Sequence, residues 1–95
     1  SLAPVLDNIL AMREAGVHVE ITNLLVTGLN DSEEHIEMLC QWMTDNGLQD
    51  VPLHFSRYFP RYKMKEPGPT PARTLFRARE TALSHGILNV YLGNV

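Results

Sequence analysis

Apolar and polar residues repeat along this chain in three similar units, each made of an amphipathic helix, a glycine and an apolar strand. In the first unit apolar side chains recur every three or four residues from Leu2 to Ala15, and Gly16 is placed to end the helix in a left-handed conformation. The second predicted helix opens at Asp31 or Ser32 and stops at Gly47, and the third opens at Thr70 and Pro71 and stops at Gly86.

Each of these glycines is followed by a short segment rich in Val, Ile, Leu, Tyr or Phe, which predicts a strand. The strands are expected over Val17 to Val26, over Val51 to Phe55 or slightly beyond, and over Ile87 to Leu92. Strands that alternate with helices of this length are typical of βαβ units, and so of a parallel sheet with helices packed on it. The predicted fold class is therefore α/β, with about three parallel strands and three helices.

Three parallel strands are few for a complete domain, because a parallel sheet normally has both faces covered. The chain also begins inside a helix and ends on a strand. We therefore expect residues 1–95 to be a single later portion of a TIM-type (β/α) barrel. The functional end of such a barrel carries the loops that follow the strands. The long connection over residues 56–69 is the predicted functional loop.

The start of the second helix is crowded with acidic residues, which the helix dipole favours there. Asp31 together with Glu34 has the form of a capping box.

Composition narrows the function classes. The chain is 44% hydrophobic and 20% charged, as ordinary globular proteins are. Its net charge of −3 does not create an overall positive potential that would attract nucleic acid. The stretch from Arg57 to Lys65 is locally basic and interleaved with aromatics, which leaves single-stranded nucleic acid as a minor alternative. No apolar run is long enough for a membrane span. The single Cys40 excludes an intrachain disulfide, fits a reducing cytosol, and cannot form a multi-cysteine metal site.

Polar residues interrupt the first predicted strand. Period two places Glu20 and Thr22 on one face together with Leu24, and Asn23 is a further polar residue of the same strand. In a barrel, polar groups near the carboxyl end of a strand can line a ligand site. The alternative is structural: Glu20 lies near an exposed edge and Thr22 bonds to backbone.

A second polar group follows at the end of the second predicted strand. His54 and Ser56 share a face and Arg57 begins the loop, so an imidazole, a hydroxyl and a guanidinium could converge on an anionic or hydrogen-bonding ligand. A single histidine in a strand is more often a structural hydrogen-bonding residue, and this alternative stays open. The other histidines lack the spacing of a zinc site.

The run from Glu20 to Ser32 resembles the fifth-strand region of radical S-adenosylmethionine enzymes related to pyruvate formate-lyase activating enzyme. The later run from Pro52 to Pro60, with Thr70-Pro71 and the ending from Val90 to Val95, is similar to the AmmeMemoRadiSam-system branch of that family. Together these runs span nearly the whole chain. The Gly-Leu-Asn-Asp turn is widely shared, whereas the His-Phe-Ser-Arg and Tyr-Leu-Gly-Asn pieces are more specific.

The resemblance implies a (β/α)₆ barrel in which a [4Fe-4S] cluster reductively cleaves S-adenosylmethionine to a 5′-deoxyadenosyl radical, which abstracts hydrogen from a substrate. The CxxxCxxC cluster loop of the family is absent from this chain. The chain is thus expected to hold no cluster itself and to contribute S-adenosylmethionine contacts and part of the substrate cavity.

The resemblance also suggests roles for particular residues. Thr22 matches an inward position that touches S-adenosylmethionine in the family. Arg57 falls near a position where relatives place a His for the same ligand, and a guanidinium there could pair with the methionyl carboxylate. The predicted cofactor-binding residues are Glu20, Thr22, Asn23, His54, Ser56 and Arg57.

The partners that the resemblance implies are the remainder of the barrel and a glycyl-radical protein or a small-molecule substrate. The single cysteine places the expected compartment in the cytoplasm. The rival interpretation is a noncatalytic α/β module that binds a partner through the loop from Arg57 to Lys65 or forms a homo-oligomer through exposed sheet edges.

Overall fold

Helices and strands alternate along the chain. The computed structural model describes residues 3–60 and 68–95. The elements are α1 (Ala3–Glu14), β1 (Ile21–Leu25), α2 (Glu33–Asp45), β2 (Leu53–Arg57), α3 (Ala72–Ser84) and β3 (Val90–Gly93). The predicted α/β class, with three parallel strands and three helices, is confirmed.

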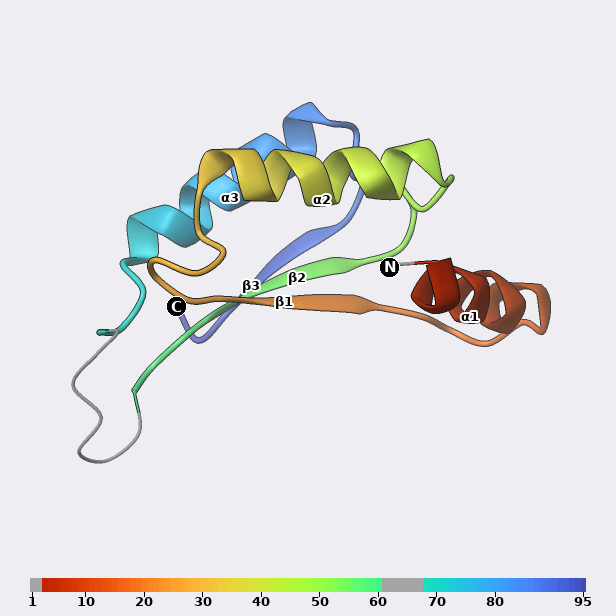
Figure 1. The fold of residues 1–95 in the computed structure, drawn as a ribbon, viewed down its shortest axis with the longest axis horizontal. Helices are drawn as coiled ribbons and strands as arrows, with labels where there is room; N and C mark the ends of the chain where they lie inside the picture. The colour runs from red at the N-terminus through yellow and green to blue at the C-terminus, as the bar shows by residue number, and fades with distance from the viewer. Residues whose placement is uncertain (1–2, 61–67) are drawn as a thin grey trace.

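The three strands form one parallel sheet in the order β1-β2-β3, so that β2 lies in the centre. Its register places Thr22 opposite His54 and His54 opposite Tyr91. Helices α2 and α3 lie side by side on one side of this sheet (Figure 1). Every second residue of each strand therefore faces these helices, and the residues between them face the other way.

The hydrophobic core lies between the sheet and these two helices. Phe55 and Leu53 of β2 and Leu25 of β1 are fully buried there. The helices and the loops that lead into the strands contribute the other core side chains: Ile9, Ile36, Cys40, Met43, Leu48, Val51, Leu75, Ala78, Ala82 and Ile87. The core thus holds the strands in place from one side only.

The strand bounds differ from the predicted ones: β1 and β3 are shorter than the sequence pattern predicts, whereas β2 has about the predicted length and is shifted toward its carboxyl end. β1 begins at Ile21 rather than Val17, since its first ladder bond runs from the Ile21 amide to the Pro52 carbonyl and β2 begins only at Leu53. Residues 17–20 therefore precede the paired region. β2 extends to Arg57, which places this residue in the strand instead of the loop.

The helix caps agree with the prediction in part, since Ser32 was one of the two predicted first residues of the second helix. Ser32 is the N-cap of α2, and its hydroxyl accepts the amide proton of His35. The carboxylate of Asp31 instead accepts from the Gly28 amide in the preceding turn, so the predicted capping box of Asp31 and Glu34 is wrong. The left-handed conformation predicted for Gly16 is confirmed by its φ of 79°.

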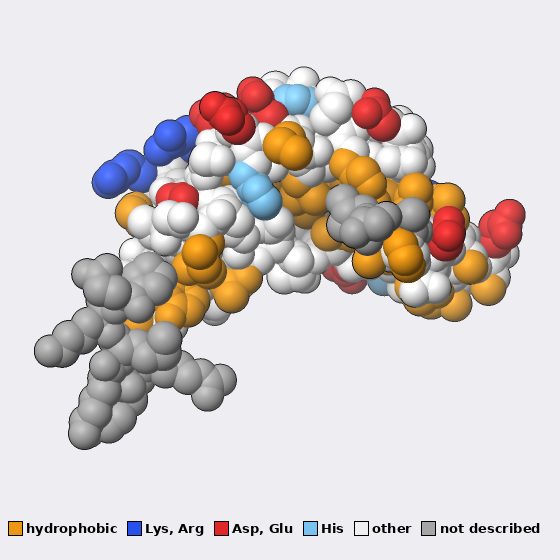
Figure 2. All heavy atoms as spheres, in the orientation of Figure 1, with side chains coloured by type: hydrophobic (Ala, Val, Ile, Leu, Met, Phe, Trp, Pro, Cys, Tyr) orange, Lys and Arg blue, Asp and Glu red, His pale blue; other side chains and the backbone are white. Residues whose placement is uncertain are grey.

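Helix α1 lies beside the start of β1, apart from the layer formed by α2 and α3 (Figure 1). The Arg13 guanidinium holds α1 there. It donates a hydrogen bond of 3.2 Å to the Gly47 carbonyl oxygen and forms an ion pair with Asp50. Apolar side chains are exposed on α1 and below α2, whereas charged side chains gather over the first turns of α2 and α3 (Figure 2). Among the described residues no helix is long and apolar enough to cross a membrane.

Candidate functional site

Six residues form the side of the sheet that faces away from α2 and α3, which we call the open face. The register arranges them in two rows across the strands, Thr22, His54 and Tyr91 in the first and Leu24, Ser56 and Gly93 in the second. Leu24 is 46% exposed and Tyr91 51% exposed, in contrast to the fully buried Phe55 on the other face. The predicted pairing of Thr22 with Leu24 on one face, and of His54 with Ser56, is confirmed.

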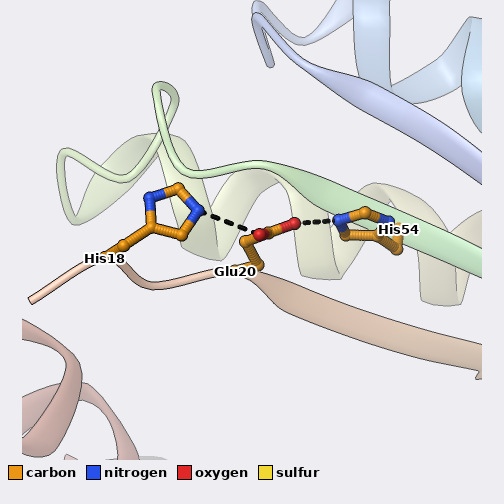
Figure 3. Close-up of polar contacts among 3 residues, drawn as sticks. All are labelled: His18, Glu20 and His54. Carbon is orange, nitrogen blue, oxygen red and sulfur yellow. Dashed lines mark hydrogen bonds and ion pairs between the residues drawn. The ribbon is translucent and has the colours of Figure 1, made fainter.

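Glu20 lies just before β1 and joins two histidines (Figure 3). One carboxylate oxygen contacts Nε2 of His54 on β2, and the other lies 2.9 Å from Nε2 of His18. Hydrogen bonds from His54 first and His18 second hold the pKa of Glu20 below its ordinary value. The carboxylate is therefore ionised at neutral pH and fixes the His54 ring at the edge of the open face.

The imidazole of His54 is supported on its other side by Tyr91 of β3. The two ring centroids are 5.1 Å apart and the ring planes differ by 26°, which is a stacked arrangement. With 34% of its side chain exposed, His54 is held from two directions and still accessible to a ligand.

Ser56 follows His54 by two residues and lies on the same face. Its neighbour across the sheet is Gly93, and a β-carbon added at Gly93 would lie 3.3 Å from the Ser56 hydroxyl oxygen. The absence of a side chain at position 93 therefore keeps space beside this hydroxyl, which also belongs to the open face.

Asn23 does not lie on this face. It alternates with Thr22 and Leu24, and its side-chain oxygen accepts from the Asn30 amide at 3.5 Å. It lines a small apolar pocket on the α2 side of the sheet, together with His35, Met38, Leu39 and Trp42. The pattern placed Asn23 among the polar residues of the strand, but period two directs it away from the others.

Arg57 is also separate from the other candidates, since it shares its face of β2 with Phe55 and not with His54 and Ser56. Its Nε donates to the Thr70 carbonyl oxygen at 2.5 Å, and its guanidinium carbon lies 4.8 Å from the centre of the Phe59 ring. The predicted convergence of imidazole, hydroxyl and guanidinium is therefore wrong for the guanidinium. Most of the basic part of the predicted loop, residues 61–67, lies outside the described residues.

Two residues of the site were missed by sequence reasoning. Tyr91 is the stacking partner of His54, and His18 is the second partner of Glu20. A signal for His18 was present, because residues two apart in extended chain point to the same side. For Tyr91 there was none, since only the register between β2 and β3 places it opposite His54.

The cysteine of this chain is unsuited to hold an iron-sulfur cluster. Cys40 is fully buried in the core, and burial, with a smaller contribution from Glu37, raises its pKa to about 11. Within residues 3–60 and 68–95, no group of three or more His, Cys, Asp or Glu side chains is placed to hold a metal ion. The described residues thus do not fit a cluster, whereas the open face has hydroxyl, imidazole and aromatic groups for an organic ligand.

The sequence matches no protein-family model. It is 39% identical over all 95 residues to the uncharacterized protein MJ0808 of Methanocaldococcus jannaschii. The chain spans 28% of the length of that protein. The similarity therefore covers the complete sheet and its helices, and it relates them to one part of a longer archaeal chain.

Proposed function

We propose that this chain forms the later helix-strand units of the barrel of a radical S-adenosylmethionine enzyme of the pyruvate formate-lyase activating type. We further propose that its open face contacts S-adenosylmethionine. The observation that carries the proposal is the division of the sheet into two faces. Two helices cover the apolar face, while the other face carries Thr22, His54 and Ser56 in adjacent register positions. In a (β/α) barrel, helices cover the outside and the opposite face of each strand lines the interior.

The chemistry of these groups suits S-adenosylmethionine. The ligand carries a carboxylate, an ammonium, ribose hydroxyls and a flat adenine ring, and the Thr22 and Ser56 hydroxyls can donate to or accept from such groups. The exposed ring of Tyr91 offers an aromatic surface. Glu20 acts through His54, since both of its carboxylate oxygens already accept from histidines.

Asn23 and Arg57 take other parts in this proposal. Asn23 belongs to the junction between β1 and the turn before α2, where Asn30 also accepts from the Val26 amide at 2.8 Å. Arg57 orders the start of the loop after β2 through Thr70 and Phe59. We assign neither residue a direct contact with the ligand.

The cluster that supplies the electron for S-adenosylmethionine cleavage in this family has to be held by another part of the proposed enzyme, in a reducing compartment such as the cytoplasm. The residues of this chain would position the ligand and close one side of the cavity. The 28% coverage of the archaeal relative is compatible with this division, because a longer chain leaves room for the remaining strands.

The direct test is calorimetric titration of S-adenosylmethionine into the chain. We expect weak but measurable binding, and Ser56→Ala should weaken it by roughly three- to ten-fold, as for one lost hydrogen bond of about 1 kcal/mol. Ser84→Ala is the matched control, because this hydroxyl donates to the Thr81 carbonyl at the end of α3. If Ser56→Ala and Ser84→Ala bound S-adenosylmethionine with equal affinity, the proposed contact between the open face and this ligand would be refuted.

A second test is made on the gene. The proposal expects a CxxxCxxC motif in the reading frame upstream of the codon for Ser1. An intact reading frame that begins at Ser1 would contradict the enzyme assignment. Chromatographic measurement of a dimer, together with no S-adenosylmethionine binding, would instead favour the partner-binding or oligomerisation module.

A further inference from the structure

The contact between Glu20 and His54 determines which nitrogen of the imidazole carries the proton. A carboxylate is only an acceptor, so Nε2 of His54, which contacts it, has to be protonated. In the neutral ring the other nitrogen, Nδ1, then holds a lone pair. The same reasoning applies to His18, whose Nε2 bonds to the second oxygen of Glu20.

His85 provides an internal contrast. Its Nδ1 lies 3.0 Å from the carbonyl oxygen of Thr81, which also only accepts, so the proton of this ring is on Nδ1. His85 ends α3 and is remote from the open face. His54 and His85 are therefore held in opposite tautomers, the first by the Glu20 carboxylate and the second by the Thr81 carbonyl oxygen.

We propose that His54 is a general base of the open face, held in its active tautomer by Glu20 and in its orientation by Tyr91. In this role His54 accepts a proton from a hydroxyl, amine or acidic C–H of a planar substrate. This inference rests on the proposed function only for the identity of the cavity that the open face lines. Glu20 is a positioning residue here, because it acts on the substrate through His54.

The arrangement suits a proton transfer for three reasons. The His54 ring is accessible, with 34% of its side chain exposed. The negative charge of Glu20 lies against the ring edge opposite Nδ1, so it stabilises the imidazolium that forms when Nδ1 takes a proton. The stacked Tyr91 restricts the rotation of the ring and adds an aromatic surface for a flat molecule.

The capacity to remove a proton can be measured with nitrobenzisoxazole, a flat compound that a base converts into a coloured phenolate. Nδ1 of His54 takes the proton from the ring carbon. The electron pair of that C–H bond forms the nitrile, and the N–O bond breaks to leave its electrons on the phenolate oxygen. The step needs no oxidant, reductant or metal.

We expect His54→Gln to lower the rate above the buffer background by at least about five-fold, since a positioned general base accelerates proton transfer by large factors. Glu20→Ala should lower it by roughly three-fold, because the imidazolium loses its counter-charge. His85→Gln is the matched control and should retain the full rate. A wild-type rate in His54→Gln, or loss of the rate only in Glu20→Ala, would overturn the assignment of the base.

The role of Glu20 has a spectroscopic readout in nitrogen NMR of the imidazole rings. We expect His54 to show a protonated Nε2 and an unprotonated Nδ1, the reverse of His85, and Glu20→Ala to add a population protonated on Nδ1. Identical ring signals with and without Glu20 would exclude the positioning role.

Titration of S-adenosylmethionine into the same proteins separates this inference from the proposed function. If the proposed function is wrong, the chain does not bind S-adenosylmethionine, but the rate that depends on His54 persists. If His54 is not the base, the chain binds S-adenosylmethionine, but its rate does not change when His54 is replaced.

Discussion

Thr70 joins the end of β1 to the segment that follows β2, and its replacement tests how the rim of the sheet is held. The side chain is fully buried. Its hydroxyl donates to the Leu25 carbonyl at 2.5 Å and accepts from the Tyr58 amide at 3.4 Å. Thr70→Val keeps the shape of the side chain and removes both hydrogen bonds.

The expected cost follows from these contacts. A typical hydrogen bond contributes roughly 0.5–1.5 kcal/mol, and a buried carbonyl left without a donor costs about 1–3 kcal/mol. The Leu25 carbonyl loses its side-chain donor, while the 3.4 Å bond is long and contributes less. We therefore expect Thr70→Val to lower the free energy of unfolding by about 2 kcal/mol, which corresponds to roughly 10 °C in Tm for a chain of this size.

The assay is urea unfolding followed by the fluorescence of Trp42, the single tryptophan of the chain. Thr70→Ser is the matched control, because it retains the hydroxyl and removes one methyl group, at a cost of about 1 kcal/mol. If Thr70→Val were as stable as wild type while Thr70→Ser lost stability, the methyl contact and not the hydroxyl would hold this junction.

Three further predictions concern the backbone, the core and the pH dependence. Gly47 has a φ of 70°, so Gly47→Ala should destabilise the chain by roughly 1–2 kcal/mol in urea unfolding, whereas Gly68→Ala, with no positive φ, should not. The Cys40 thiol, whose pKa is raised to about 11 by burial, should react with a thiol reagent only as fast as the chain unfolds; rapid labelling in native buffer would contradict its burial. The lowered pKa of Glu20 contributes stability above the ordinary value of 4.5, which is lost as the pH falls through the folded-state pKa. Glu20→Gln should therefore flatten the acid side of the stability curve, and an unchanged curve would refute this contribution.

The local elements could be predicted because their signals lie close together in the chain. The helix that ends before Gly47 is visible as an apolar repeat followed by a glycine, and the φ of this residue agrees with that role. The strand ends and the caps were less accurate. Ser32 and Asp31 are both good capping residues. The Asp31 carboxylate accepts a hydrogen bond from the Gly28 amide, so Ser32 is the residue that caps α2.

Part of the candidate site was also accessible from sequence. The period of two in a strand separates Thr22 from Asn23 and His54 from Phe55 without knowledge of any neighbour. What it leaves open is which of the two sets faces solvent. Arg57 is an example. Its charge indicated a contact with a ligand, but it lies two residues from Phe55 in β2 and therefore on the same face as Phe55.

The sequence by itself determined the α/β class, the three helix-strand units and the alternation of side chains within each strand, because these depend on residues a few positions apart. Only the tertiary structure decided that Thr22, His54 and Tyr91 stand in one row and that Glu20 contacts His54. These contacts join segments separated by tens of residues. They depend on the register of the sheet and on the side that α2 and α3 cover, which no local pattern specifies.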